Sequence, residues 1–150
     1  MKIIINRSTK LILGIGNQAL IFSTNNLSGF DQMALDLDSL DQTISNPEII
    51  LTLRFYYWTG DWISIGHHQK EIPPHWEKLL SNREINIVRR PSGGGSVLHS
   101  GGITYALTFK KTYYKILSYE MVNNWLIKSV RELGLNLQNG TVRKLSLIHI

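Results

Sequence analysis

The sequence predicts an α+β domain with a mixed, largely antiparallel sheet backed by helices on one side. Residues 49–58 and 103–109 are rich in β-branched and aromatic residues, as strands are. Residues 30–43 instead repeat apolar residues at helical spacing. The expected order of elements is strand, helix, hairpin, short helix, strands around a glycine loop, helix and strand, which is an α+β arrangement. The 43% of hydrophobic residues in 150 can supply a single core.

The N-terminal stretch, residues 1–17, is expected to be an extension or an extra strand ahead of a catalytic domain that covers residues 18–150. Its two short apolar runs are separated by the polar residues 6–10. This pattern is too interrupted for a membrane span, and no clear cleavage site follows it.

A first helix is expected from about Phe30 to Thr43. Ser28 and Gly29 can cap its N-terminus, and Asp31 in the first turn complements the helix dipole. Its apolar face is expected to hold Met33, Leu37, Leu40 and Ile44.

The long strand at Ile49–Trp58 is expected to be central, and Trp62–Gly66 should return beside it as a hairpin partner. Trp58, Trp62 and Ile65 are then candidate walls of an apolar pocket. Ordinary core packing is the alternative for each of them.

The remaining elements are expected around the middle and the end of the chain. They are a short helix at His75–Ser81, strands at Ile85–Arg90 and Ile103–Phe109, a helix from Ser118 to Gly134 and a last strand at Leu135–Leu137.

The expected site of chemistry is the stretch 87–109, where two arginines precede three consecutive glycines and a histidine. Residues 91–95 must form a loop, and a loop without Cβ atoms exposes its N–H groups to a ligand. Such groups make an anion site, and Arg89 and Arg90 add charge that suits phosphate or carboxylate. A mobile hairpin turn is the alternative interpretation.

Several other classes of function are disfavoured by composition and motifs. The glycine loop lacks the Lys and Ser or Thr of a P-loop, and residues 14–19 lack the helix that a dinucleotide fingerprint requires. No cysteine is present to act as a nucleophile or zinc ligand. The net charge of +5 favours anionic partners, but the basic residues are scattered, which does not favour nucleic acid.

The glycine stretch resembles the signature of the lipoate–protein ligase A and octanoyltransferase family. The similarity is carried by RRPSGGGSVLH at residues 89–99, GFDQMALD at 29–36 and SIGHHQ at 64–69. It covers roughly residues 18–138. Ser100 and Leu37 depart from the family pattern, because acidic residues are common at both positions.

The resemblance implies the biotin and lipoate ligase catalytic module, which is class II synthetase-like. The main expectation is a cytoplasmic ligase that activates lipoate or octanoate as acyl-AMP, using ATP with Mg²⁺, and transfers it to a lysine. Its partners would be lipoyl domains of 2-oxoacid dehydrogenases or the glycine cleavage H protein. No membrane partner is implied.

The resemblance also implies the residues of the site. The expected ligand-binding residues are Arg90, Ser92, Gly93, Gly94, Gly95, Ser96, Val97, Leu98 and His99, and the expected acyl pocket is Trp58 and Ile65. Arg90 and the N–H groups of Gly95 to Leu98 would hold a phosphate. No metal ligand is expected, and the catalytic Lys or Cys of the family is expected beyond residue 150, since Lys144 lacks small neighbours.

Two alternatives remain open at this point. One is an octanoyltransferase that takes octanoate from a carrier protein through a cysteine thioester and needs no cofactor. The other is a truncated homologue that binds an acyl group or adenylate without catalysis.

Overall fold

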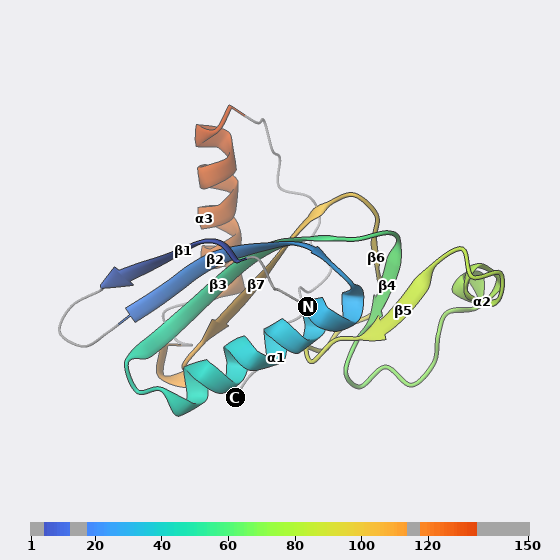
Figure 1. Cartoon of the computed structure of the whole chain (residues 1–150), viewed down its shortest axis with the longest axis horizontal. Coiled ribbons are helices and arrows are strands. Elements are labelled where there is room, and N and C mark those ends of the chain that lie inside the picture. Colours follow the sequence, from blue (N-terminus) through green and yellow to red (C-terminus); the bar gives the residue numbers. More distant parts are fainter. Residues whose placement is uncertain (1–4, 13–17, 114–117, 135–150) are drawn as a thin grey trace.

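The computed structural model describes residues 5–12, 18–113 and 118–134, and its strands form two sheets (Figure 1). The larger sheet has the order β1 (Ile5–Ile12), β2 (Gln18–Leu27), β3 (Ile49–Trp58) and β7 (Ile103–Phe109). The smaller sheet has the order β5 (Asn86–Arg89), β4 (Trp62–Ile65) and β6 (Val97–His99). The helices are α1 (Gly29–Ser45), α2 (Pro74–Ser81), the short 3₁₀ helix η1 (Lys111–Tyr113) and α3 (Tyr119–Glu132).

Strand β3 is central in the larger sheet, as predicted. It runs parallel to β2 and antiparallel to β7, and Phe55 lies opposite Tyr105 in the second pairing. Strand β1 pairs antiparallel with β2, so residues 5–12 are the extra strand, one of the two structures expected for the N-terminal stretch. The mixed α+β fold predicted from the sequence is therefore confirmed.

The predicted hairpin between β3 and β4 is wrong. Strand β4 instead pairs parallel with β5 and antiparallel with β6 in a sheet of its own. All four residues of β4 are buried, so both of its faces require cover that the edge of the larger sheet does not provide. Trp62 is therefore not paired with β3, but its ring still packs beside that of Trp58, with centroids 6.2 Å apart.

Helix α1 lies along one face of the larger sheet (Figure 1). Ser28 caps it by accepting a hydrogen bond from the Asp31 N–H, as its sequence predicted. The predicted apolar face is only partly correct, because Leu37 and Ile44 are about half exposed. The buried residues of the helix are Gly29, Gln32, Met33, Ser39 and Thr43. Most of this face is polar or small, because it packs on buried polar side chains of β2 and β3.

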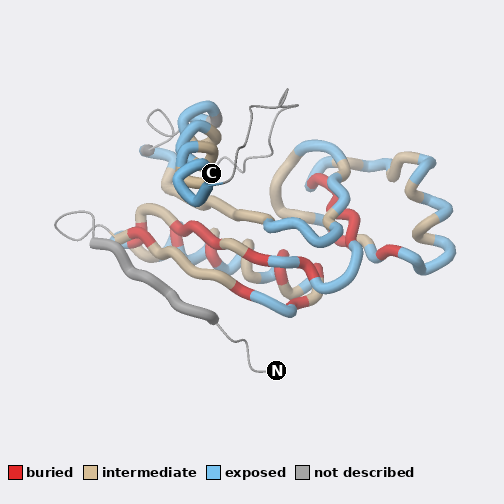
Figure 2. Tube along the Cα trace, turned by 90° about the horizontal axis from the view of Figure 1, so that it is seen from above, coloured by how far each residue is buried: buried red, intermediate tan, exposed pale blue. Residues whose placement is uncertain are grey.

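Helix α3 begins after Ser118, the residue predicted to start it, and the Ser118 hydroxyl caps it by accepting from the Met121 N–H. No apolar residue is fully buried in the described part of this helix, residues 120–132, and Trp125 is 48% exposed. Figure 2 shows buried residues concentrated on α1 and on β3 and β4, and exposed ones along α3. The expected last strand, residues 135–137, and Lys144 lie outside the described residues.

The core has two parts that follow the two sheets. One contains Met33, Tyr56, Trp58, Trp62 and Val88. The other contains Ile63, Ile65 and Ile85, which pack against Trp76 and Leu79 of α2. No helix within the described ranges combines the length and apolar character needed to cross a bilayer.

Candidate functional site

The glycine loop, which we define as residues 91–96, connects β5 to β6 and lies over the end of β4. Gly94 adopts a φ of +89°, a left-handed conformation that favours glycine. The loop rests directly on Gly66, where an added Cβ would lie 1.9 Å from the Gly94 carbonyl oxygen. Both glycines are therefore required by the backbone, whereas Gly93 and Gly95 have open space where a side chain would begin.

Arg90 lies behind the glycine loop, and its guanidinium faces main-chain carbonyls. Its Nη2 donates to the carbonyl oxygens of Gly93 (2.8 Å) and Gly95 (2.6 Å). Its Nη1 donates to the carbonyl oxygen of Ser64 (2.8 Å) and to the Ser64 hydroxyl (3.1 Å). Arg90 was expected to bind a phosphate together with the loop amides, but its guanidinium instead binds the carbonyl groups of the loop itself.

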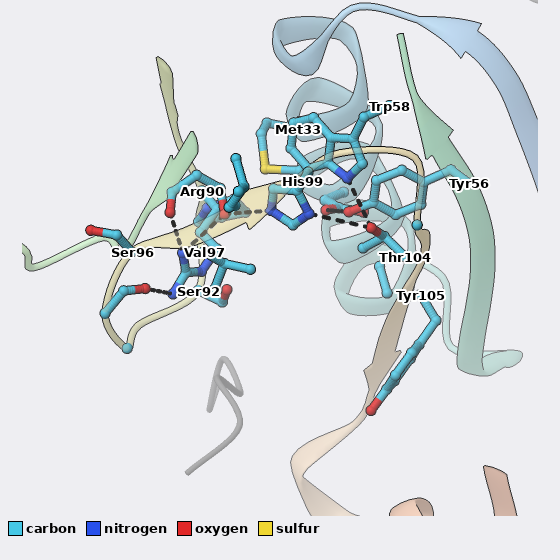
Figure 3. A pocket seen from close by; sticks show the side chains of 18 of the residues that line it. Met33, Tyr56, Trp58, Arg90, Ser92, Ser96, Val97, His99, Thr104 and Tyr105 are labelled. Atoms are coloured by element: carbon cyan, nitrogen blue, oxygen red, sulfur yellow. Dashed lines mark hydrogen bonds between the residues drawn. The ribbon is translucent and has the colours of Figure 1, made fainter. Parts of the chain in front are cut away.

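His99 lies between the Arg90 side of the site and the large sheet (Figure 3). Its ring stacks on Trp58 with centroids 4.0 Å apart and planes 17° from parallel. Its Nε2 is 2.8 Å from the Ser64 hydroxyl, and its Nδ1 is 3.5 Å from the hydroxyl of Thr104. Trp58 Nε1 donates to the same Thr104 oxygen at 2.8 Å. These contacts fix the ring from both sides.

Burial and, to a smaller extent, the nearby positive charge of Arg90 together lower the pKa of His99 to about 4. The imidazole is therefore neutral near pH 7 and has a single N–H. Both ring nitrogens already face hydroxyl groups, so this neutral, fixed imidazole shapes the site with its ring and does not add a second cation beside Arg90.

A cavity of about 940 Å³ lies between the glycine loop and the open face of β7. Its apolar wall includes Met33, Leu40, Trp58, Leu107 and Phe109, while Ser92, Ser96 and His99 contribute polar groups near the loop. This combination of a large apolar space with a few convergent polar groups is typical of a small-molecule site.

A buried polar network supports the wall of this cavity. Arg54 is completely buried and forms an ion pair with Asp36 at 2.6 Å, while its guanidinium lies 3.8 Å from the centre of the Tyr56 ring. The Tyr56 hydroxyl donates to the second oxygen of Asp36 at 3.2 Å. Burial raises the pKa of Asp36, and Arg54 opposes this rise. Burial also raises the pKa of Tyr56, so its hydroxyl stays protonated and can donate.

This network was not predicted from the sequence, although one signal was available. Arg54 is a charged residue in the middle of an apolar, aromatic strand, and a buried arginine requires a carboxylate or several acceptors. Asp36 on the preceding helix was the candidate partner. Ser64 and Thr104, which hold His99, had no comparable signal in the sequence.

The structure brings most of the predicted site residues together. Of the nine predicted ligand-binding residues all but Gly93 border the cavity, and so does Trp58 of the predicted acyl pocket. Ile65 lies elsewhere: it packs with Ile63 and Ile85 beneath α2 and does not line this cavity, because it follows Ser64 along β4 and faces the other side of the strand.

The amides predicted to hold a phosphate, those of Gly95 to Leu98, do not all lie in the glycine loop. Val97 and Leu98 already belong to β6 and pair with β4. The N–H groups of Ser92, Gly94, Gly95 and Ser96 are the ones in this loop without a hydrogen-bond partner among the described residues.

Comparison with known proteins identifies the family. Residues 28–144 match the family model of the lipoyl protein ligase A/B catalytic domain. The chain belongs to this family. Similar proteins include the octanoyltransferase LipM of Kyrpidia tusciae, 34% identical over 95 residues, which cover 60% of this chain and 35% of the relative. LipM of Brevibacillus brevis is 31% identical over 118 residues, which cover 75% of this chain and 42% of the relative.

Solved structures of the family share the fold of the chain. A bi-partite lipoate protein ligase from Thermoplasma acidophilum gives a TM-score of 0.54 at 21% identity, and the match covers 84% of this chain and 49% of that one. A lipoate-protein ligase A bound with ATP gives a TM-score of 0.53 at 23% identity, with 89% and 53% covered. The chain thus spans about half the length of these ligases, and less than half that of the two octanoyltransferases.

Proposed function

We propose that this member of the family binds an octanoyl thioester and presents it for transfer to a lysine of a lipoyl domain. In this reaction the C–S bond of the thioester breaks, an amide C–N bond forms, the amine loses a proton and the carrier thiol is released. No nucleotide is consumed. The similarity to octanoyltransferases supports this function over the ligase that was the main expectation from the sequence.

The observation that carries the proposal is that the Arg90 guanidinium is already hydrogen-bonded to the protein. Among the described residues that line the cavity, Arg90 is the one Lys or Arg, and both of its terminal nitrogens already donate to the protein. ATP brings three phosphates that require several cations or a bound metal. A neutral thioester requires an apolar slot and a few N–H groups at its carbonyl, which this cavity offers.

We assign the residues as follows. The acyl chain would lie along Met33 and Trp58, and the thioester carbonyl would accept from the amides of Gly94 and Gly95. Preorganised donors of this kind stabilise the oxyanion that forms during acyl transfer. His99 would border the carbonyl end with its neutral ring, which the Ser64 and Thr104 hydroxyls hold in place.

A ligase is the second candidate, favoured by the run of three glycines that resembles ligase members. Its nucleotide would be ATP with Mg²⁺. The described residues fit this cofactor poorly, because Asp36 is already paired with Arg54 and no group of three or more metal-binding side chains occurs in the described ranges. The two candidates differ in the ligand that binds best.

Calorimetry with two non-hydrolysable ligands distinguishes these functions. The ketone probe is octanoyl-pantetheine with a methylene in place of sulfur, and the adenylate probe is octanoyl-sulfamoyl adenosine. We expect the ketone probe to bind at least as tightly as the adenylate probe, and both to bind more tightly than octanoate. Adenylate binding about tenfold or more tighter than ketone binding would contradict the proposal and favour the ligase.

A further inference from the structure

Two adjacent arginines at the end of β5 hold two different loops by their carbonyl groups. Arg90 holds the glycine loop through Gly93 and Gly95, as described above. Arg89 holds a second loop, residues 66–69: its Nη1 donates to the carbonyl oxygens of Gly66 (2.8 Å), His67 (3.2 Å) and Gln69 (2.7 Å). Consecutive side chains at a strand end point to opposite sides, so one short segment can reach both loops.

The two loops are also joined directly to each other at three places. The His67 N–H donates to the Ser92 carbonyl oxygen at 2.8 Å, at the start of the glycine loop. The Gln69 side chain donates to the Ser96 hydroxyl at 2.7 Å, at its end. Between these points Gly94 lies directly on Gly66. The loops therefore form one hydrogen-bonded unit anchored on β5.

This arrangement decides which groups of the glycine loop face a ligand. The carbonyls of Ser92, Gly93 and Gly95 are held within the protein. The amides of Ser92, Gly94, Gly95 and Ser96 have no partner among the described residues, and these residues border the cavity. A loop with three glycines loses much conformational entropy when it orders, so a fixed set of donors requires strong external contacts. Charge-assisted bonds from a planar guanidinium supply such contacts, and a lysine cannot reproduce this fork.

We propose that Arg89 and Arg90 are positioning residues, which hold loop 66–69 and the glycine loop as one rigid unit whose amides contact the acyl donor. This proposal rests on the proposed function, because it assumes that the acyl carbonyl lies at the glycine loop. It differs from the direct contact between Arg90 and a phosphate that the sequence led us to expect. The two roles predict different consequences for the same substitution.

The test is Arg90→Lys, which keeps the charge but removes the fork. If Arg90 acts through the loop, the ketone probe and the adenylate probe should both lose affinity by the same factor, on the order of tenfold. A loss confined to the adenylate probe would overturn the proposal, since it would mean that Arg90 contacts the anionic group itself.

Amide hydrogen exchange gives a second measurement that needs no ligand. Arg90→Lys should raise exchange at His67, whose N–H donates to the Ser92 carbonyl oxygen of the glycine loop. Arg89→Met removes the donor to loop 66–69 and should raise exchange at His67 and Gln69, while β3 keeps its protection. Unchanged exchange at His67 and Gln69 in these variants would also overturn the proposal. The matched control is Arg83→Lys on the exposed turn after α2, which should change neither exchange nor affinity.

Gln69→Leu tests the link between the loops while both arginines stay in place. Removing its bond to the Ser96 hydroxyl should loosen the contact between the loops and raise exchange at His67, whose N–H donates to the Ser92 carbonyl oxygen. Unchanged exchange at His67 would contradict a unit built from these bonds. If the unaltered chain binds neither probe, the proposed function fails, whereas the exchange experiments still decide whether the arginines hold the loops.

Discussion

At the scale of single residues, the site depends on groups whose ordinary properties are changed by their neighbours. His99 would be half protonated near pH 6.5 in water, but stacking on Trp58 and burial near Arg90 keep it neutral. A position just after a strand ordinarily accepts a side chain, but at Gly66 the Gly94 carbonyl oxygen occupies the space that a Cβ would need. Each of these effects can be measured by one substitution.

The neutral state of His99 predicts a pH-dependent stability. The pKa of His99 in the folded protein, about 4, is below its ordinary value of 6.5. Between these values the unfolded chain binds a proton that the folded chain does not, so acidification favours unfolding. Thermal unfolding should therefore show the wild type losing stability relative to His99→Gln as the pH falls from 7 to 5. The slope should stay below the ~1.4 kcal/mol per pH unit of one full proton, because His99 is partly exposed.

A difference between the two proteins that stays constant over this range would contradict the assignment of a lowered pKa. Glutamine is the suitable replacement, since it can still donate to Ser64 or accept from it without titrating.

The contact between Gly66 and Gly94 predicts unequal effects of two glycine substitutions. Gly66→Ala must displace the glycine loop, so it should destabilise the fold by about 1–3 kcal/mol and abolish binding of the ketone probe. Gly93→Ala has open space for its Cβ and should leave the stability unchanged within about 0.5 kcal/mol. Urea unfolding beside calorimetry measures both. Equal destabilisation by the two substitutions would show that the contact does not constrain the loop.

At the scale of elements, a buried polar network rather than an apolar seam joins α1 to β3. Arg54 donates to the Gln32 carbonyl oxygen (2.8 Å) as well as to Asp36, and Gln32 donates to the Tyr57 carbonyl oxygen (2.9 Å). This explains why helical periodicity alone misplaced the buried face of α1. The network also lies beside the cavity, since Asp36 and Tyr56 line it.

The network predicts that the free energy of unfolding depends strongly on both members of the ion pair, Arg54 and Asp36. Asp36→Ala leaves the buried Arg54 without its carboxylate, so it should reduce the free energy of unfolding by about 3–5 kcal/mol. The double variant Asp36→Leu with Arg54→Met removes both charges and should be more stable than Asp36→Ala. Urea unfolding of the variants is the measurement. A double variant less stable than Asp36→Ala would show that the other hydrogen bonds of Arg54 matter more than its charge pair.

At the scale of the whole molecule, the cavity belongs to neither sheet alone. β7 and α1 provide the apolar wall, and the loops of the smaller sheet provide the polar groups. His99 connects the two sides, because its strand belongs to the smaller sheet while its ring stacks on Trp58 of the larger one.

Binding without transfer is the prediction at this scale. The 150 residues contain no cysteine, so they cannot form the cysteine thioester of the octanoyltransferase branch. The chain as given should bind the ketone probe yet transfer no octanoyl group to a lipoyl domain from octanoyl carrier protein. Mass spectrometry of the lipoyl domain after incubation checks this. An octanoyl mass shift that disappears in Ser64→Ala or His99→Gln would contradict it, and would identify a nucleophile within these residues.

The sequence by itself determined the strands at residues 49–58 and 103–109, the cap at Ser28, the start of the last helix at Ser118, the glycine loop and its family. These features depend on local patterns: β-branched runs, capping hydroxyls and consecutive glycines. Only the tertiary structure decided that β4 leaves β3, that Ile65 faces away from the cavity, and that Arg90 faces carbonyls. Each of these depends on which segments distant in the sequence come together, since a side chain's role follows from the partners that burial gives it and not from its neighbours along the chain.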